Sequence, residues 1–296
     1  MKWRKVGRGG VIDRRGAGGR GLGVPLGGGV GGLGLIGVVL AILFSSGVLG
    51  GGGGGIGIDV GPRFDPFGGA PSAQSGERLP GAPDPDARLR DFVAFVVDNV
   101  QGSWAQAFQE AGQRYEPTKL VLFEGNTESG CGFASSATGP FYCPRDRLVY
   151  LDLGFFRELR DRFGAPGDFA QAYVIAHEFG HHIQTITGIS DDVRNEQQSN
   201  PDAANDLSIR LELQADCLAG VWGHSAYEQQ LLESGDLEEG LRAAAAIGDD
   251  RIQRETTGEI DPETWTHGSS EQRVEWFSRG FGEGDPAACD TFTGEI

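Results

Sequence analysis

The stretch DFAQAYVIAHEFGHHIQTIT, residues 168–187, decides the fold. Its apolar residues recur with helical spacing, so we expect one helix of about nineteen residues that ends at Gly188. His177 and His181 are four residues apart, and residues with this spacing lie on one face of a helix. Both imidazoles can therefore bind the same metal ion.

The sequence of residues 177–181 is H-E-x-x-H, a pattern typical of zinc-dependent hydrolases. Zinc with three protein ligands keeps a fourth position for water and lowers the pKa of that water to about 7. Glu178 occupies the position of the general base in such sites, and this arrangement suggests hydrolysis of an amide. His182 is rotated by roughly 100° from His181, so we interpret it as a packing residue rather than a ligand.

A second long helix is expected from about residue 202 to 230, and it contains LELQAD at 211–216. Glu212 and Asp216 are four residues apart and again share one face. This E-x-x-x-D spacing makes Glu212 the third zinc ligand and Asp216 the residue that orients a ligating histidine through its other ring nitrogen. Gly180 is unfavourable in a helix by about 1 kcal/mol, so we expect another backbone to pack closely against it.

A catalytic zinc site also needs a donor for the developing oxyanion. The segment THGSSEQRVEWF at 266–277 offers His267 and Arg273 for this role. His224 is a second choice, because it follows Glu212 by twelve residues on a somewhat rotated face of the same helix. Ordinary structural roles are the alternative for all three residues.

The pattern of residues 87–296 as a whole predicts an α+β domain that is mainly helical and has a small sheet. An amphipathic helix is expected to begin near Arg88 and strands are expected at 118–125 and 147–153, with a hairpin between them that the first two cysteines close at its ends. Two capping boxes are expected, at Asp168 with Gln171 and at Ser269 with Gln272.

The N-terminal part is different in composition. Residues 1–21 are a basic head, 22–58 a glycine-rich segment without charges, and 59–86 a linker rich in Pro, Gly and Ser that we expect to be disordered. The apolar core at 33–49 predicts a single transmembrane helix, with the head in the cytoplasm and the domain, residues 87–296, outside. A cleavable signal peptide and a flexible glycine-rich segment are the alternatives.

The net charge and the cysteines indicate which partners the protein can bind and in which cellular compartment it lies. The net charge of −17 disfavours nucleic-acid binding, because such a surface repels phosphates. The four cysteines follow the predicted span and should lie in an oxidising compartment. Sequence alone leaves three pairings open; we favour Cys131–Cys143 with Cys217–Cys289, and buried free thiols are the alternative.

The motifs HEFGHH, LELQAD and THGSSEQRVEWF closely resemble those of the bacterial family described as putative neutral zinc metallopeptidases. The likeness extends to MKWR and VIDRRG at the start of the chain and to GDPAACDTF near its end. It implies a membrane-anchored endopeptidase with one Zn²⁺ per chain, a zincin-like core, and a small sheet whose edge holds an extended protein or peptide substrate.

Two other hypotheses fit part of the pattern. Peptide deformylases combine H-E-x-x-H with an upstream cysteine ligand, which would make Cys131, in ESGCGFA, the third ligand in place of Glu212. A tethered binding or scaffold module would keep zinc for structure alone. Glu178 argues against the module, because a structural site has no use for a base beside its ligand and is usually closed by four protein ligands.

Overall fold

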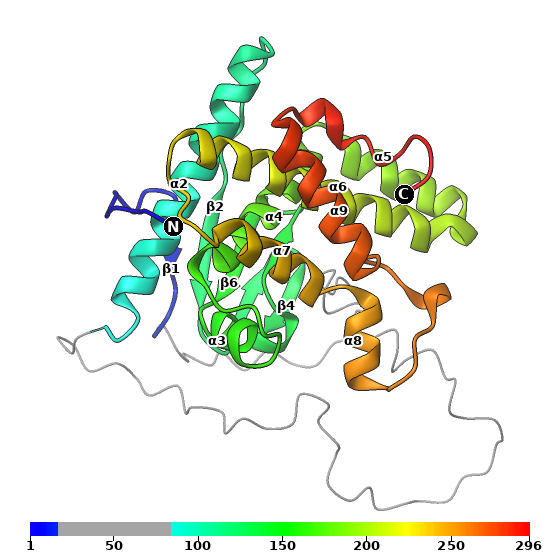
Figure 1. The fold of residues 1–296 in the computed structure, drawn as a ribbon, viewed down its shortest axis with the longest axis horizontal. Helices are drawn as coiled ribbons and strands as arrows, with labels where there is room; N and C mark the ends of the chain where they lie inside the picture. Colours follow the sequence, from blue (N-terminus) through cyan, green and yellow to red (C-terminus); the bar gives the residue numbers. More distant parts are fainter. Residues whose placement is uncertain (17–83) are drawn as a thin grey trace, which may run out of the picture.

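The computed structural model describes residues 1–16 and 84–296. The predicted α+β class is confirmed: helices pack around a small sheet, as Figure 1 shows. The sheet has the order β1-β2-β6-β5, with β1, β2 and β6 parallel and β5 antiparallel to β6. Its strands are β1 (Val11–Asp13), β2 (Lys119–Phe123), β5 (Phe141–Cys143) and β6 (Leu148–Asp152).

The helices are α2 (Ala87–Glu110), α3 (Gly154–Asp161), α4 (Asp168–Ile186), α5 (Ile189–Ser199), α6 (Ala204–Glu228), α7 (Asp236–Ala246), α8 (Asp249–Thr256) and α9 (Ser270–Glu283). Both long helices expected around the zinc motifs are present as α4 and α6. Helix α4 is the centre of the domain, because it contacts α2, α6, α7 and β5 and is buried along nearly its whole length. No helix in the described part of the chain is long and apolar enough to span a bilayer.

The two predicted capping boxes have different outcomes. The box at α9 is confirmed, because the Ser269 hydroxyl accepts a hydrogen bond from the backbone N–H of Gln272 and Oε1 of Gln272 accepts one from the backbone N–H of Ser269. The box at α4 is wrong, because the residue before the helix is Gly167, and the amide of Phe169 in the first turn donates to the Glu239 carboxylate from α7 instead. The Asp168 carboxylate instead accepts a hydrogen bond from the amino group of Met1, a partner that no local pattern reveals.

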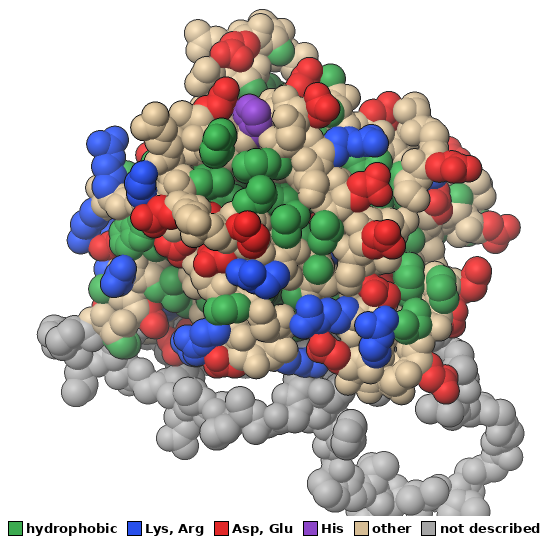
Figure 2. Space-filling model, viewed as in Figure 1, with side chains coloured by type: hydrophobic (Ala, Val, Ile, Leu, Met, Phe, Trp, Pro, Cys, Tyr) green, Lys and Arg blue, Asp and Glu red, His purple; other side chains and the backbone are tan. Residues whose placement is uncertain are grey.

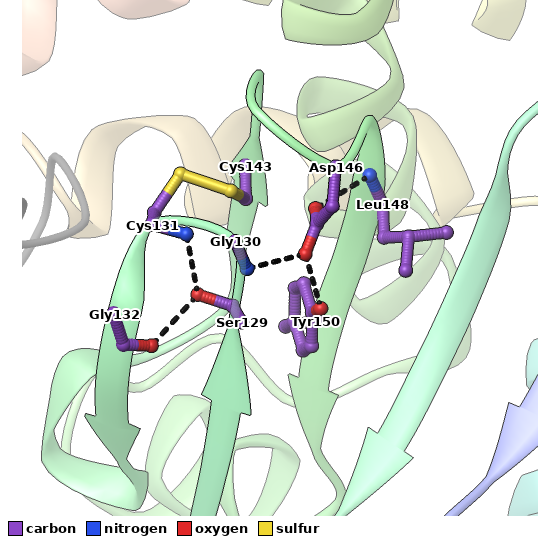
Figure 3. The surroundings of a disulfide bond; sticks show 8 residues. All are labelled: Ser129, Gly130, Cys131, Gly132, Cys143, Asp146, Leu148 and Tyr150. Atoms are coloured by element: carbon purple, nitrogen blue, oxygen red, sulfur yellow. Dashed lines mark hydrogen bonds between the residues drawn. A yellow bond between two sulfur atoms is a disulfide. The ribbon is translucent and has the colours of Figure 1, made fainter.

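The predicted hairpin closed by Cys131 and Cys143 is also different in the structure. The hairpin consists of β3 (Asn126–Ser129) and β4 (Gly132–Ser135), and Cys131 lies in its turn. Cys131 is joined to Cys143 at the end of β5, so the disulfide ties the hairpin tip to the main sheet (Figure 3). The Asp146 side chain supports this corner by accepting hydrogen bonds from the Gly130 amide and the Tyr150 hydroxyl. The second favoured pair, Cys217–Cys289, is present as well.

Residues 1–16 pack on the domain and add β1 to the edge of β2, which differs from the separate cytoplasmic head that the sequence suggests. The basic side chains find acidic partners on the domain: Lys5 and Arg8 both pair with Asp91 on α2. Strand β1 shares hydrogen bonds with β2, so residues 11–13 lie directly against the domain. The predicted span at 33–49, and the linker up to residue 83, lie outside the described residues.

Helices α6 and α9 approach so closely that glycines are required between them. A Cβ atom added at Gly280 would lie 1.9 Å from the carbonyl oxygen of Cys217, and one added at Gly220 would lie 2.2 Å from that of Phe277. Gly180 has the same role between α4 and α6, because its Cβ would lie 3.0 Å from the Ala215 backbone. The close backbone expected at Gly180 is therefore present.

This packing predicts that Gly280→Ala destabilises the domain, because the two backbones must separate to admit the methyl group. The cost should be about 1–3 kcal/mol or more, which lowers the melting temperature by several degrees. Gly282→Ala is the matched control on the same helix, because nothing lies within 4 Å of its added Cβ. Thermal denaturation that ranks Gly282→Ala as the more damaging change would contradict the packing.

Candidate metal centre

The three predicted ligands converge on one point inside the domain. His177 and His181 project from α4 and Glu212 projects from α6, and their ligand atoms all lie within 4.8 Å of one another. The Nε2 atom of His177 is 3.1 Å from Oε2 of Glu212, and Nε2 of His181 is 3.5 Å from Oε1. Two ligand atoms of a tetrahedral zinc ion are about 3.3 Å apart, given bonds of about 2.0–2.1 Å. The spacing therefore fits zinc.

The outer nitrogen of each histidine is held by a hydrogen-bond partner, so that each Nε2 faces the centre. His177 Nδ1 is 2.9 Å from Oδ1 of Asp216, at the position where the sequence analysis expects Asp216. His181 Nδ1 is 2.8 Å from Oε1 of Gln184, whose amide group donates to the carbonyl oxygen of Leu211 on α6. Sequence reasoning missed Gln184, although its place three residues after His181 is a usable signal.

The electrostatics of the centre also suit a cation. Burial raises the pKa of Glu212, but the neighbouring His181 and His267 outweigh it and hold that pKa well below its usual range. Burial opposes protonation of His177, yet the attraction of Asp216 and Glu212 raises its pKa to about 10. The carboxylates of Glu212 and Asp216 thus favour positive charge at this point, and a bound divalent metal ion would provide it.

Glu178 is buried beside the ligands and lines the same cavity as His177 and Glu212. Burial raises the pKa of Glu178, and the positive charges of His181 and His177 offset this only in part. The backbone amide of Tyr142 on β5 stabilises the ionised carboxylate, so β5 lies directly beside this side chain. A carboxylate with a raised pKa suits a group that must both accept and release a proton.

Arg273 is placed differently from its predicted role as an oxyanion donor. Its Nε donates to Oδ2 of Asp216 over 2.8 Å and its Nη2 donates to Oδ1 over 3.0 Å, and its side chain is 1% exposed. The Tyr173 hydroxyl also donates to Asp216. Arg273 therefore neutralises the carboxylate that orients His177, and the Tyr173 hydroxyl helps to hold it in place. Tyr173 lies one helical turn before His177, which is the only sequence signal for it.

His267 remains at the site. Its Nδ1 is 3.3 Å from Oδ1 of Asp249, and the backbone amide of His267 donates to Oδ2 of the same residue. The ring lines the cavity of Glu178, and within the described residues no group hydrogen-bonds to Nε2, which therefore remains accessible to a substrate. The partner Asp249 was missed, because it is 18 residues away in the sequence with no pattern that links the two.

The other two histidines lie outside the metal centre. His224 Nδ1 bonds to the carbonyl oxygen of Phe281, and the ring lines a different cavity between α2 and α6. His182 Nδ1 lies 3.1 Å from the Tyr142 hydroxyl, and its Nε2 lies 2.6 Å from the carbonyl oxygen of Glu116. His182 is thus a buried packing residue that connects α4 to β5. Cys131, the ligand of the deformylase hypothesis, is oxidised in a disulfide and offers no thiolate.

Comparison with known proteins identifies relatives over most of the chain. The family model described as "Putative neutral zinc metallopeptidase" matches residues 1–292. "Uncharacterized protein YpfJ" of Escherichia coli (strain K12) is 50% identical over 225 residues, which are 76% of this chain and 78% of the relative. "Uncharacterized protein Rv2575" of Mycobacterium tuberculosis (strain ATCC 25618 / H37Rv) is 46% identical over 190 residues, 60% of this chain and 64% of the relative. No solved structure matches the chain.

Proposed function

The chain belongs to the family described as putative neutral zinc metallopeptidases, and from this premise we propose that it is a zinc-dependent endopeptidase. The observation that carries the proposal is the position of Glu178, which shares a buried cavity with two of the three converging ligands. The described residues supply three ligand atoms here and no fourth. An incomplete ligand set beside a buried carboxylate favours catalysis over a structural role for zinc.

A zinc ion held by His177, His181 and Glu212 would act as a Lewis acid, which would lower the pKa of water and polarise the substrate carbonyl. Glu178 accepts a proton from the attacking water and delivers it to the leaving amine. With a proton on each ring nitrogen, His267 donates from Nε2 to the developing oxyanion, while its Nδ1 donates to the Asp249 carboxylate, which fixes the orientation of the ring. Asp216, Tyr173 and Arg273 keep His177 fixed behind the reacting atoms.

The sheet offers a place for an extended substrate. Among the strands of residues 1–16 and 84–296, β5 pairs with β6 alone, so we propose that its other edge pairs with a peptide. That edge lies beside Glu178, and pairing would bring a peptide bond close to the catalytic groups. Acidic side chains are spread over the face shown in Figure 2, which together with the net charge of −17 favours a polypeptide over a nucleic acid as substrate.

The test is hydrolysis of a defined peptide mixture by the purified protein, followed by mass spectrometry. We expect internal peptide bonds to be cleaved, the cleavage to stop when a zinc chelator is added, and the activity to return with added Zn²⁺. Metal-loaded protein that cleaves no peptide in a diverse mixture would contradict the proposed function.

We further propose that residues 1–16 and the domain share an extracytoplasmic compartment, because two disulfides persist only under oxidising conditions. A membrane-impermeant maleimide should label Gly7→Cys and Gly102→Cys equally in cells with a permeable outer envelope. Both sites have open space around the added side chain. Labelling of Gly102→Cys alone would contradict this proposal and support a single membrane crossing between the head and the domain.

A further inference from the structure

An apolar cavity extends from the metal centre into the domain. One end of it is lined by His177, Glu178, Glu212, His267 and Arg273, all of which belong to the site described above. From there it continues between α3, α4 and the segments around α8, where its walls are apolar: Phe155, Phe163, Val174, Ile247 and Ile252. The cavity volume is about 90 Å³.

The apolar walls come from four separate parts of the fold, so the cavity forms only when these parts pack together. Phe155 belongs to α3 and Val174 belongs to α4, one turn before His177. Ile247 and Ile252 stand at the end of α7 and on α8, and both keep part of their surface exposed. Core side chains of this size are normally packed against one another, whereas these face a space next to the catalytic groups.

We infer that this cavity receives the aliphatic side chain of a substrate residue adjacent to the scissile bond, so that the peptidase selects Leu, Ile or Val at that position. The inference rests on the proposed function. The cavity opens beside Glu178 and His267, so a peptide whose carbonyl lies between them has a flanking side chain at the entrance.

The size of the cavity also limits which substrate side chains it can hold. An apolar cavity of about 150 Å³ holds benzene. A space of about 90 Å³ therefore suits a branched aliphatic group and excludes an indole ring. A side chain of similar size with a polar end, such as Asn, would lose hydrogen bonds to water when it packs against the apolar walls formed by Phe155, Val174 and Ile247. Discrimination of roughly 100-fold between Leu and Asn is expected from such a pocket.

Charged side chains in the lining, away from the catalytic residues along the sequence, suggest a rival occupant. Glu158 and Glu255 contribute to the lining, and a lysine or arginine of the substrate could extend past the apolar walls toward them. Arg162 stands in the same region and weakens this attraction by its own positive charge. The apolar walls therefore favour an aliphatic occupant, and a basic one is an outcome that the experiment must separate.

The experiment compares zinc-loaded wild type with two variants of Ile252 and one matched control. In peptide libraries randomised on both sides of the cleaved bond, wild type should prefer Leu, Ile or Val at one fixed adjacent position. Ile252→Trp fills the cavity and should lower kcat/KM at least about 10-fold for a Leu peptide, with little change for its Ala counterpart. Ile252→Ala enlarges the cavity and should shift the preference toward Phe. Ile260→Trp, at a residue that is 42% exposed and outside the lining, should behave as wild type.

A binding measurement separates this inference from the proposed function. Calorimetry should show that the zinc-loaded protein binds leucine hydroxamate at least about 10-fold more tightly than asparagine hydroxamate, and that Ile252→Trp removes the difference. If this holds while no peptide is cleaved, the selectivity stands and the peptidase proposal fails. Equal affinities for the two hydroxamates, a preference for Lys or Arg in the cleaved peptides, or an equal loss for all peptides in Ile252→Trp would overturn the inference.

Discussion

Replacing Glu178 by glutamine should abolish peptide hydrolysis and leave the metal content unchanged. Glutamine has nearly the same size and can still fill the buried position, but it cannot accept a proton from water. General-base catalysis contributes typically 10²–10⁴-fold, so kcat/KM should fall by about 10³-fold. The structure makes the variant a clean test, because Glu178 is not among the three converging ligands.

The measurement is steady-state hydrolysis of the best library peptide, with zinc determined on the same samples. Glu238→Gln is a suitable control, because this residue is exposed on α7 and carries the same change of charge. Activity of Glu178→Gln within a few-fold of Glu238→Gln would show that another group activates the water. Loss of zinc from Glu178→Gln would instead show that this carboxylate is a ligand.

The second large effect is expected for Arg273→Met, which should destabilise the fold as well as impair catalysis. Arg273 is almost fully buried and forms two hydrogen bonds to Asp216, which is itself fully buried. Removing the guanidinium leaves an uncompensated charge in the core, which typically costs about 3–5 kcal/mol. The melting temperature should therefore fall on the order of 10 °C.

Two further variants identify the cause of this loss. Arg242→Met removes an exposed arginine on α7 and should have little effect. The double variant Arg273→Met with Asp216→Leu removes both charges and should regain part of the stability, while His177 still lacks its orienting carboxylate. Zinc affinity in the double variant should thus stay low even where the fold recovers. An Arg273→Met melting temperature equal to that of Arg242→Met would contradict the role assigned to the buried pair.

The parts of the site that the sequence predicts well are those with short-range patterns. His177 and His181 share a helical face by their spacing, and Glu212 and Asp216 do so on the second helix. Helical periodicity also predicts the lengths of α4 and α6, because long amphipathic or buried helices leave a strong signal. What the spacing cannot give is the distance between the two helices, which Gly180 sets by allowing close contact with Ala215.

The contacts that sequence reasoning missed join distant segments. Arg273 reaches Asp216 from another helix, and Asp249 reaches His267 from the start of α8. A motif scan expects charged groups near a zinc ion to face the substrate, whereas a buried guanidinium is satisfied first by the nearest carboxylate. The strand β1 was missed for a related reason: three residues, Val11–Asp13, are too short to show periodicity, and their pairing with β2 bridges more than a hundred residues.

The central claim is that His177, His181 and Glu212 bind one zinc ion, and the most direct test is the zinc content of the purified protein measured by atomic spectrometry. Wild type and Glu238→Gln should hold zinc near one ion per chain, and Glu212→Gln should lose most of it after dialysis against a weak chelator. Zinc retained at full occupancy by Glu212→Gln, or absent from wild type, would contradict the account.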